Sequence, residues 1–204
     1  MNLKALILAS AAALALPAHA GLTSNVADIG NALTITFEDY DGYLTEGPEA
    51  VAPGVTFTGT AGSQLGAYIA DLGDNGLWGL GNHFAATGVV GSLHFTFDDA
   101  YTSAAGAYLN SFDGSAMAVI AYGENDQILE SYIVSFDGDS SDWNNGQFFG
   151  ITRDSADIRA IAFMGMGLVA DDMTYAAPVP EPETYAMMLA GLGLLGFMAK
   201  RRAK

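Results

Sequence analysis

Short runs of alternating hydrophobic and polar residues recur along the middle of the chain. Leu33, Ile35 and Phe37 alternate with threonines, and the segments 55–58 and 93–97 show the same period. Because successive side chains of a β-strand point to opposite faces of its sheet, each run predicts a strand with one buried face. Further strands are expected on the same grounds over residues 105–110, 117–122, 128–135, 147–152, 158–164 and 169–175.

No long stretch with helical periodicity separates these runs. Glycine, asparagine and aspartate residues stand between them, and the segment 123–126, Gly-Glu-Asn-Asp, is expected to form a hairpin turn. Strands without helices to cover them must bury their apolar faces against a second sheet. About nine or ten short strands therefore predict an all-β domain, a jelly roll or a related two-sheet β-sandwich.

The first part of the chain has the composition of an export signal. It holds one charged residue, then an apolar stretch, and the triplet Ala-His-Ala stands before residue 21. This arrangement is typical of a secretory signal peptide. We expect signal peptidase to cut between Ala20 and Gly21, so that residues 1–20 are a signal peptide and residues 21–177 form the exported domain.

The end of the chain reads as a spacer, a membrane helix and a basic stop. Val-Pro-Glu-Pro begins at Val179, an apolar stretch follows, and Lys200, Arg201 and Arg202 come after it. Residues 184–199 would rise about 24 Å as a helix, against a hydrocarbon core of about 30 Å, so a single short transmembrane helix is predicted. Because positive charge stays cytoplasmic, the preceding domain would lie outside the inner membrane.

The segment 178–204 resembles the PEP-CTERM sorting signal, in which a Pro-Glu-Pro block precedes a glycine-rich membrane stretch and a terminal basic cluster. Pro180, Glu181 and Pro182 match this block. The resemblance implies recognition by an exosortase, an integral-membrane protease that cleaves near the block. It also implies an association with exopolysaccharide and biofilm, and transient anchoring in the inner membrane before a cell-surface or extracellular location.

Between its two ends the chain is strongly acidic. Residues 21–177 contain 21 aspartates and glutamates against Arg153 and Arg159, which gives a formal charge of −19. Such a surface repels phosphate backbones and anionic lipid headgroups, so neither nucleic acid nor a peripheral membrane surface is expected as a partner. The chain has no cysteine, which excludes disulfides and thiolate metal sites. Oxygen-ligated calcium is the metal that this composition could hold.

The last predicted strand, 169–175, contains two consecutive aspartates, and the segment 148–151 reads Phe-Phe-Gly-Ile. Together they resemble the jelly-roll domain common in PEP-CTERM proteins. A closing strand with paired aspartates also recurs in calcium-containing carbohydrate-binding jelly rolls, where it meets an acidic stretch that follows the first strand. The resemblance implies a structural calcium held by Glu38, Asp39, Asp171 and Asp172. The alternative is that these carboxylates are solvated strand ends.

Sugar binding requires an aromatic ring beside amides and carboxylates, because one face of a pyranose is apolar and its hydroxyls need directional partners. Trp143 lies in the polar segment Ser-Asp-Trp-Asn-Asn, and Trp78 lies in a glycine-rich segment. Both are candidate sugar-stacking residues. The alternative for each is that it plugs the end of the sandwich. His94 lies on the polar side of a predicted strand and is expected to face solvent.

No activated nucleophile and no zinc-hydrolase motif is present, so no catalytic residues are assigned and the chain is not expected to be an enzyme. The leading hypothesis is an exported, exosortase-processed surface or matrix protein that binds exopolysaccharide and is stabilised by calcium. Two alternatives stay open. One is a secreted carbohydrate-active hydrolase with a carboxylate pair across a cleft, and the other is a structural or adhesive matrix protein without a sugar ligand.

Overall fold

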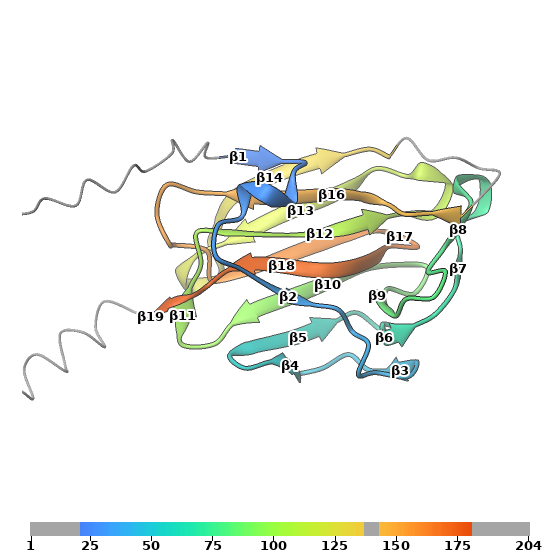
Figure 1. The fold of residues 1–204 in the computed structure, drawn as a ribbon, viewed down its shortest axis with the longest axis horizontal. Coiled ribbons are helices and arrows are strands. Elements are labelled where there is room, and N and C mark those ends of the chain that lie inside the picture. The colour runs from blue at the N-terminus through green and yellow to red at the C-terminus, as the bar shows by residue number, and fades with distance from the viewer. Residues whose placement is uncertain (1–20, 137–142, 181–204) are drawn as a thin grey trace, which may run out of the picture.

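Two antiparallel sheets face each other in the computed structural model, which describes residues 21–136 and 143–180 (Figure 1). The first, sheet A, runs in the order β1 (Gly21–Thr23), β16 (Gln147–Thr152), β12 (Ala104–Asn110), β18 (Val169–Ala176), β9 (Phe84–Ala86), β6 (Gln64–Ala67) and β3 (Tyr43–Leu44), and β2 (Ala32–Ile35) also pairs with β18. The second, sheet B, runs in the order β14 (Ile128–Val134), β13 (Met117–Tyr122), β17 (Ala160–Met166), β10 (Val90–Phe97), β5 (Val55–Gly59) and β4 (Glu49–Ala52). The predicted all-β, two-sheet sandwich is confirmed.

The main core lies between these sheets. Large aromatic residues come from sheet B, where the ring centroids of Phe57 and Phe95 are 5.5 Å apart and those of Phe95 and Phe163 are 6.3 Å apart. Sheet A contributes smaller residues to the same core, among them Ala105 and Ala107. All five side chains are fully buried. Alternating large and small side chains let two sheets reach the packing density of protein interiors.

The strands predicted by period-two alternation are present, with ends shifted by at most a few residues. The hairpin predicted at 123–126 joins β13 to β14 and contains a short 3-10 helix, Glu124–Asp126. One predicted face differs. Ile35 is buried in the core, whereas Leu33 is 47% exposed, opposite Tyr175 near the end of β18.

The glycine-rich region before β10 forms short strands that the alternation pattern did not predict. Besides β6 and β9 it contains β7 (Ala70–Asp71) and β8 (Leu77–Trp78), separated by a 3-10 helix, Gly73–Asn75. These two strands and β15 (Trp143–Asn144) form a three-stranded sheet, sheet C, in which β15 runs parallel to β8. Two-residue strands are too short to show a period, which is why the sequence did not reveal them.

A smaller apolar cluster joins sheet C to the outer face of sheet A. Leu72 and Trp78 pack with Phe84 and Val169, and all four are buried. Successive residues of β9 and β18 therefore alternate between two cores. Phe84 and Val169 face the small cluster, whereas their neighbours Ala85 and Ala170 face the main core.

The two ends of the domain differ in what they carry. The pairing of β11 (Ala100–Tyr101) with β19 (Val179–Pro180) lies at one end of the domain, and β7 and β8 lie at the opposite end (Figure 1). The remaining 3-10 helices are Val26–Asp28 and Phe112–Gly114. Within the described ranges no helix is long and apolar enough to span a membrane. The predicted membrane segment, like the predicted signal peptide, lies outside those ranges.

Candidate functional site

A β-bulge in β18 directs two neighbouring carboxylates away from the main core. Along the β12–β18 pairing, Tyr108 stands opposite Asp171 and Gly106 stands opposite Thr174, so β18 contains one more residue than its partner. Asp172 has a left-handed φ of 47° at this point. A regular strand would point adjacent aspartates to opposite faces, and the extra residue removes that constraint.

Both aspartates line a pocket of about 150 Å³ between sheet C and the outer face of sheet A. Its aromatic lining comes from Trp78, Tyr108 and Trp143. The rest of the lining consists of Gly79, Leu80, Asn82, Asn144, Asn145, Asp171 and Asp172. The structure thus brings together both tryptophans and both β18 aspartates that the sequence singled out, from segments almost a hundred residues apart.

Trp78 forms a buried wall of this pocket. It is 3% exposed, and its ring meets the edge of Phe84 at 6.0 Å between centroids. Gly146 lies directly against the indole ring of Trp78. A Cβ placed at Gly146 would lie only 2.2 Å from Trp78 Cζ3, and the φ of Gly146 is +70°. Glycine alone accommodates that conformation and that contact. Trp78 is therefore part of the small apolar cluster between sheet C and sheet A, and it also lines the pocket.

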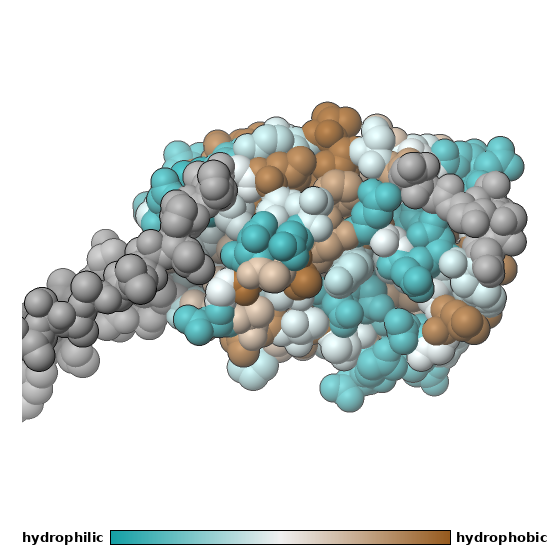
Figure 2. Space-filling model, turned by 45° about the horizontal axis from the view of Figure 1, so that its top comes forward, coloured by the Kyte–Doolittle hydropathy of each residue, from teal (hydrophilic) through white to brown (hydrophobic). Residues whose placement is uncertain are grey.

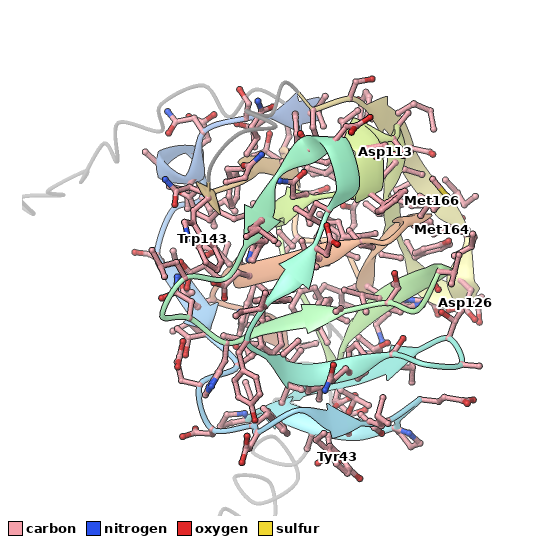
Figure 3. All side chains as sticks on the ribbon, turned by 90° about the vertical axis from the view of Figure 1, so that its right-hand side faces the viewer. Tyr43, Asp113, Asp126, Trp143, Met164 and Met166 are labelled. Carbon is pink, nitrogen blue, oxygen red and sulfur yellow. The ribbon has the colours of Figure 1, made fainter. Side chains whose placement is uncertain are left out.

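Trp143 is half-buried, and β15 holds it at the pocket. Its neighbour Asn144 is fixed on both sides, since Asn144 Nδ2 donates to the carbonyl of Asn75 at 3.3 Å and Asn144 Oδ1 accepts from the Gly146 N–H at 2.7 Å. In Figure 3, Trp143 lies well away from Tyr43 and Asp113. The loop is therefore anchored by its backbone pairing and by an asparagine side chain.

The carboxylates in the pocket occupy a poorly solvated and negative environment. Burial is the main cause that raises the pKa of Asp171 to about 7, and the charges of Asp172 and Glu38 raise it further, whereas the N–H of Asp172 and the charge of His83 oppose the rise. Asp172 donates that N–H to Asp171 Oδ1 at 2.7 Å. The pKa of Asp172 is raised as well, by burial and then by Glu38.

Glu38 and His83 form a pair beside the aspartates. The Glu38 carboxylate accepts the His83 N–H at 2.9 Å and lies 3.2 Å from His83 Nδ1. The His83 ring also packs against Tyr68, with 4.9 Å between centroids. Asn82, the residue before His83, lines the pocket, so this pair fixes one side of it.

The four predicted calcium ligands are only partly brought together. Glu38 acts electrostatically on Asp171 and Asp172, but its carboxylate is directed to His83. The charge of Asp39 acts on Tyr40 instead. Across residues 21–136 and 143–180, no group of three or more histidines, aspartates and glutamates is arranged to hold a metal ion. The described side chains thus do not form a calcium cage, and calcium binding stays a prediction.

The other predicted sites lie mainly outside the described residues. These are Ala20 at the predicted cleavage site, Glu181 and Pro182 of the sorting block, and the basic stop at 200–202. Pro180 is described only as part of β19, paired with Ala100. Gly21 begins β1, opposite Thr152 of β16.

His94 differs from its expectation. It lies on the outer face of sheet B, but it is half-buried, and its ring stacks on Tyr122 with 5.2 Å between centroids. His94 Nε2 is buried and has no hydrogen-bond partner among the described residues. An aromatic neighbour two strands away, which a single sequence does not reveal, covers this ring.

Sequence reasoning missed the contributions of Tyr108 and Asn82 to the pocket. Tyr108 lies in a strand that the sequence predicted, but the sequence indicated no role for its side chain. Asn82 lies in a glycine-rich loop whose path no periodicity fixes. Only the meeting of sheet C with β12 and β18 makes these residues neighbours.

The C-terminal segment matches a known family model. The model of the PEP-CTERM protein-sorting motif matches residues 178–202. None of the curated proteins matches the chain.

The domain has weak likeness to three solved β-structures. A mutant of the lectin binding domain of Lectinolysin, complexed with Lewis b, has 13% identity over 46% of this chain and 71% of its own, with a TM-score of 0.33. CsCBM6-3 from Clostridium stercorarium, in complex with cellobiose, has 15% identity over 71% and 92%, with a TM-score of 0.33. The enzymatically active domain of bacteriophage CBA120 tailspike protein 4 has 11% identity over 76% and 20%, with a TM-score of 0.30.

Likeness at this level supports no conclusion about this chain. The match at the end of the chain is more specific, because it covers the Pro-Glu-Pro block and the basic cluster that follows it. Residues 178–202 are therefore a PEP-CTERM protein-sorting motif, and this chain is an exosortase substrate whose sorting tail follows an all-β sandwich domain.

Proposed function

We propose that this chain is a non-catalytic protein of the cell surface or extracellular matrix, and that its pocket binds a sugar unit of exopolysaccharide. The observation that carries the proposal is the convergence of Trp143 with Asn144, Asn145 and the aspartates of β18 in one pocket. An aromatic side chain supports the apolar face of a sugar ring, while amides and carboxylates accept and donate hydrogen bonds to its hydroxyls.

The position of the pocket favours such a role. It lies at the end of the domain that carries sheet C, whereas β19, where the sorting motif begins, lies at the opposite end (Figure 1). A domain held or delivered through its tail would thus present the pocket away from the attachment point. The face in Figure 2 shows hydrophilic residues spread between hydrophobic ones, as expected of a surface exposed to water.

The arrangement of the carboxylates supports binding rather than hydrolysis. Asp171 and Asp172 are neighbours on one strand, so they approach a ligand from the same side. A glycosidase holds its two carboxyl groups across the scissile bond, about 5 to 9.5 Å apart. No described residue of the pocket supplies a third carboxylate on the opposite wall.

Retention on the exopolysaccharide of the producing cells tests the proposal. The full chain should be retained, Trp143→Ala should reduce retention at least about tenfold, and Tyr43→Ala should not, because Tyr43 is 49% exposed and lies away from the pocket (Figure 3). Equal retention of both variants would contradict a role for the pocket. Release of reducing sugar by the wild-type chain would favour the hydrolase alternative instead.

Calcium is tested separately, by thermal unfolding. If calcium stabilises the domain, EDTA lowers its unfolding temperature and added calcium restores it, because a ligand that binds only the folded state stabilises that state. Unchanged unfolding temperatures in EDTA and in calcium would remove calcium from the proposal. The sugar-binding role would then rest on the pocket alone.

A further inference from the structure

We infer that the pocket selects a sugar bearing a protonated amine, so that its ligand class is a polysaccharide containing free amino sugars. This inference rests on the proposed function and specifies the substrate class of the same site. The placement of two carboxylates, the charges around them and the tryptophan beside them all favour such a ligand.

Asp171 lines the pocket and is nearly buried. The residue is 6% exposed, and its Oδ1 accepts the N–H of Asp172. Its second carboxylate oxygen has no hydrogen bond from any described residue, while the residue lines the pocket. Burial disfavours the ionised form of this carboxyl group, so a ligand that supplies a charged donor stabilises the carboxylate.

No described cation neutralises the two aspartates from within the pocket, whose lining contains no lysine, arginine or histidine. Arg153 is bound to Glu130 and Asp157, and Arg159 donates to the carbonyl of Ala100 and lies 5.8 Å from the ring of Tyr101. His83, the nearest described basic group, is held by Glu38. Residues 137–142, which precede Trp143, include no basic residue in the sequence.

The charge of the ligand is therefore constrained. A uronic acid or another acidic sugar would place a third negative charge against the two carboxylates. A neutral sugar would displace water from them without supplying an opposite charge. An ammonium group adds no negative charge, and it supplies the opposite charge that a neutral sugar lacks. When the ammonium group binds, the rise in the pKa of Asp171 that burial causes would be reversed.

Trp143 adds an independent preference for the same ligand. Indole is the aromatic ring that attracts cations most strongly through its face, and the attraction grows when water is excluded. The same ring can stack on the apolar face of the sugar that carries the amine. Carboxylates from β18 and an aromatic ring from β15 thus favour one chemical class from two sides of the pocket.

Binding of three defined hexasaccharides to the full chain tests the inference. The probes are the β-1,4-linked hexamer of glucosamine, its fully N-acetylated form and a hexagalacturonate, measured by calorimetry at pH 6.5 in EDTA. The glucosamine hexamer should bind at least about tenfold more tightly than the acetylated one, since a charge-assisted hydrogen bond is lost on acetylation. The galacturonate should not bind.

Matched variants separate the pocket from general attraction between a polycation and an acidic protein. The double substitution Asp171→Asn with Asp172→Asn should abolish the preference for the glucosamine hexamer. The control is the double substitution Asp98→Asn with Asp99→Asn, which removes the same two charges from another pair of adjacent aspartates. This control variant should retain the preference for the glucosamine hexamer. If the Asp171/Asp172 double variant has a lowered unfolding temperature, the single substitution Asp172→Asn replaces it in the comparison. Asparagine tolerates the left-handed conformation at position 172.

The possible outcomes are distinct. Equal affinity for the acetylated and free-amine hexamers would overturn the inference and leave the proposed function standing. An equal loss in the two double variants would overturn it as well, because the attraction would be non-specific. A preference that appears only when calcium replaces EDTA would assign the carboxylates to a metal ion. Failure of all three probes would overturn the amino-sugar class, while retention on the native exopolysaccharide would decide the proposed function separately.

Discussion

Trp78 and Trp143 line one pocket but differ in how deeply they are buried. Trp78 belongs to the apolar cluster that joins sheet C to sheet A, and its ring contacts Phe84 and backs onto Gly146. Trp143 is half-buried at the pocket. A residue of the same type thus has a mainly structural role in one place and an accessible surface in the other.

Substitution of each tryptophan by alanine should therefore have different consequences. Trp78→Ala should lower the free energy of unfolding by about 3 to 5 kcal/mol, the typical cost of truncating a buried tryptophan. Trp143→Ala should lower it by about 1 kcal/mol or less, since less of the side chain is removed from water. Urea unfolding measures both. Equal losses would contradict the different burial of the two rings.

His94 gives the domain a dependence of stability on pH. Burial lowers the pKa of His94, and the charge of Asp126 only partly opposes this effect. As the pH falls through the ordinary histidine pKa of about 6.5, the unfolded chain takes up a proton that the folded chain does not. The contribution of His94 to stability is therefore complete above that pH and decreases as the pH falls toward the lower folded-state pKa.

His94→Phe should reduce this acid-induced loss. The phenyl ring can keep the stacking on Tyr122 and removes the unpartnered Nε2. Between about pH 7.5 and 5.5, the variant should lose less unfolding free energy than the wild type, because its ring does not titrate. Comparing the two proteins cancels the contributions of other groups, including Asp171. Parallel pH profiles would show that His94 is not the titrating group.

At the scale of the elements, the bulge in β18 builds the site. Ala170 and Met173 both face the main core, although a regular strand would place them on opposite faces. The extra residue between them restores the alternation and leaves both aspartates outside that core. The Thr174 hydroxyl donates to the carbonyl of Asp172 at 2.8 Å, which fixes the bulge on its C-terminal side.

The conformation of the bulge predicts which substitutions it tolerates. Asp172→Val should lower the free energy of unfolding by about 1 to 2 kcal/mol relative to Asp172→Gly, because a β-branched residue is strained at a φ of 47°. Asp172→Asn is the matched control and should resemble the wild type. Chemical denaturation of the three variants measures the difference. Equal stability of the valine and glycine variants would exclude a left-handed residue at this position.

The sandwich strands could be predicted from the sequence because each is long enough to show its period. β13 and β16 have the predicted bounds, and β10 contains the predicted segment. Sheet C could not be predicted in this way, since its strands have only two residues each. The bulge was also hidden, because nothing in the segment 169–175 distinguishes an extra residue from a regular one.

At the scale of the whole molecule, the pocket and the start of the sorting motif lie at opposite ends of a strongly acidic domain (Figure 1). The net charge is −16 for the complete chain, and the two arginines of the domain are both engaged by neighbouring groups. Self-repulsion of this kind opposes the compact state, and dissolved salt screens it.

Salt should therefore stabilise the folded protein. Raising sodium chloride from about 10 mM to 0.5 M shortens the distance over which charges interact from about 30 Å to a few ångströms, so the unfolding temperature should rise. Scanning calorimetry measures it, and choline chloride serves as the control for specific sodium binding. A falling unfolding temperature would indicate that attractive ion pairs, such as those of Arg153, outweigh the repulsion.

The sequence by itself determined the sorting segment, the all-β class and the acidic composition, because each depends on local order or composition. The sorting block is recognised by consecutive residues, and a strand by the period of its own side chains. Only the tertiary structure decided that Trp143, Trp78 and the aspartates of β18 share one pocket. That arrangement depends on a bulge and on contacts between segments distant in the chain, and neither leaves a local pattern in the order of residues.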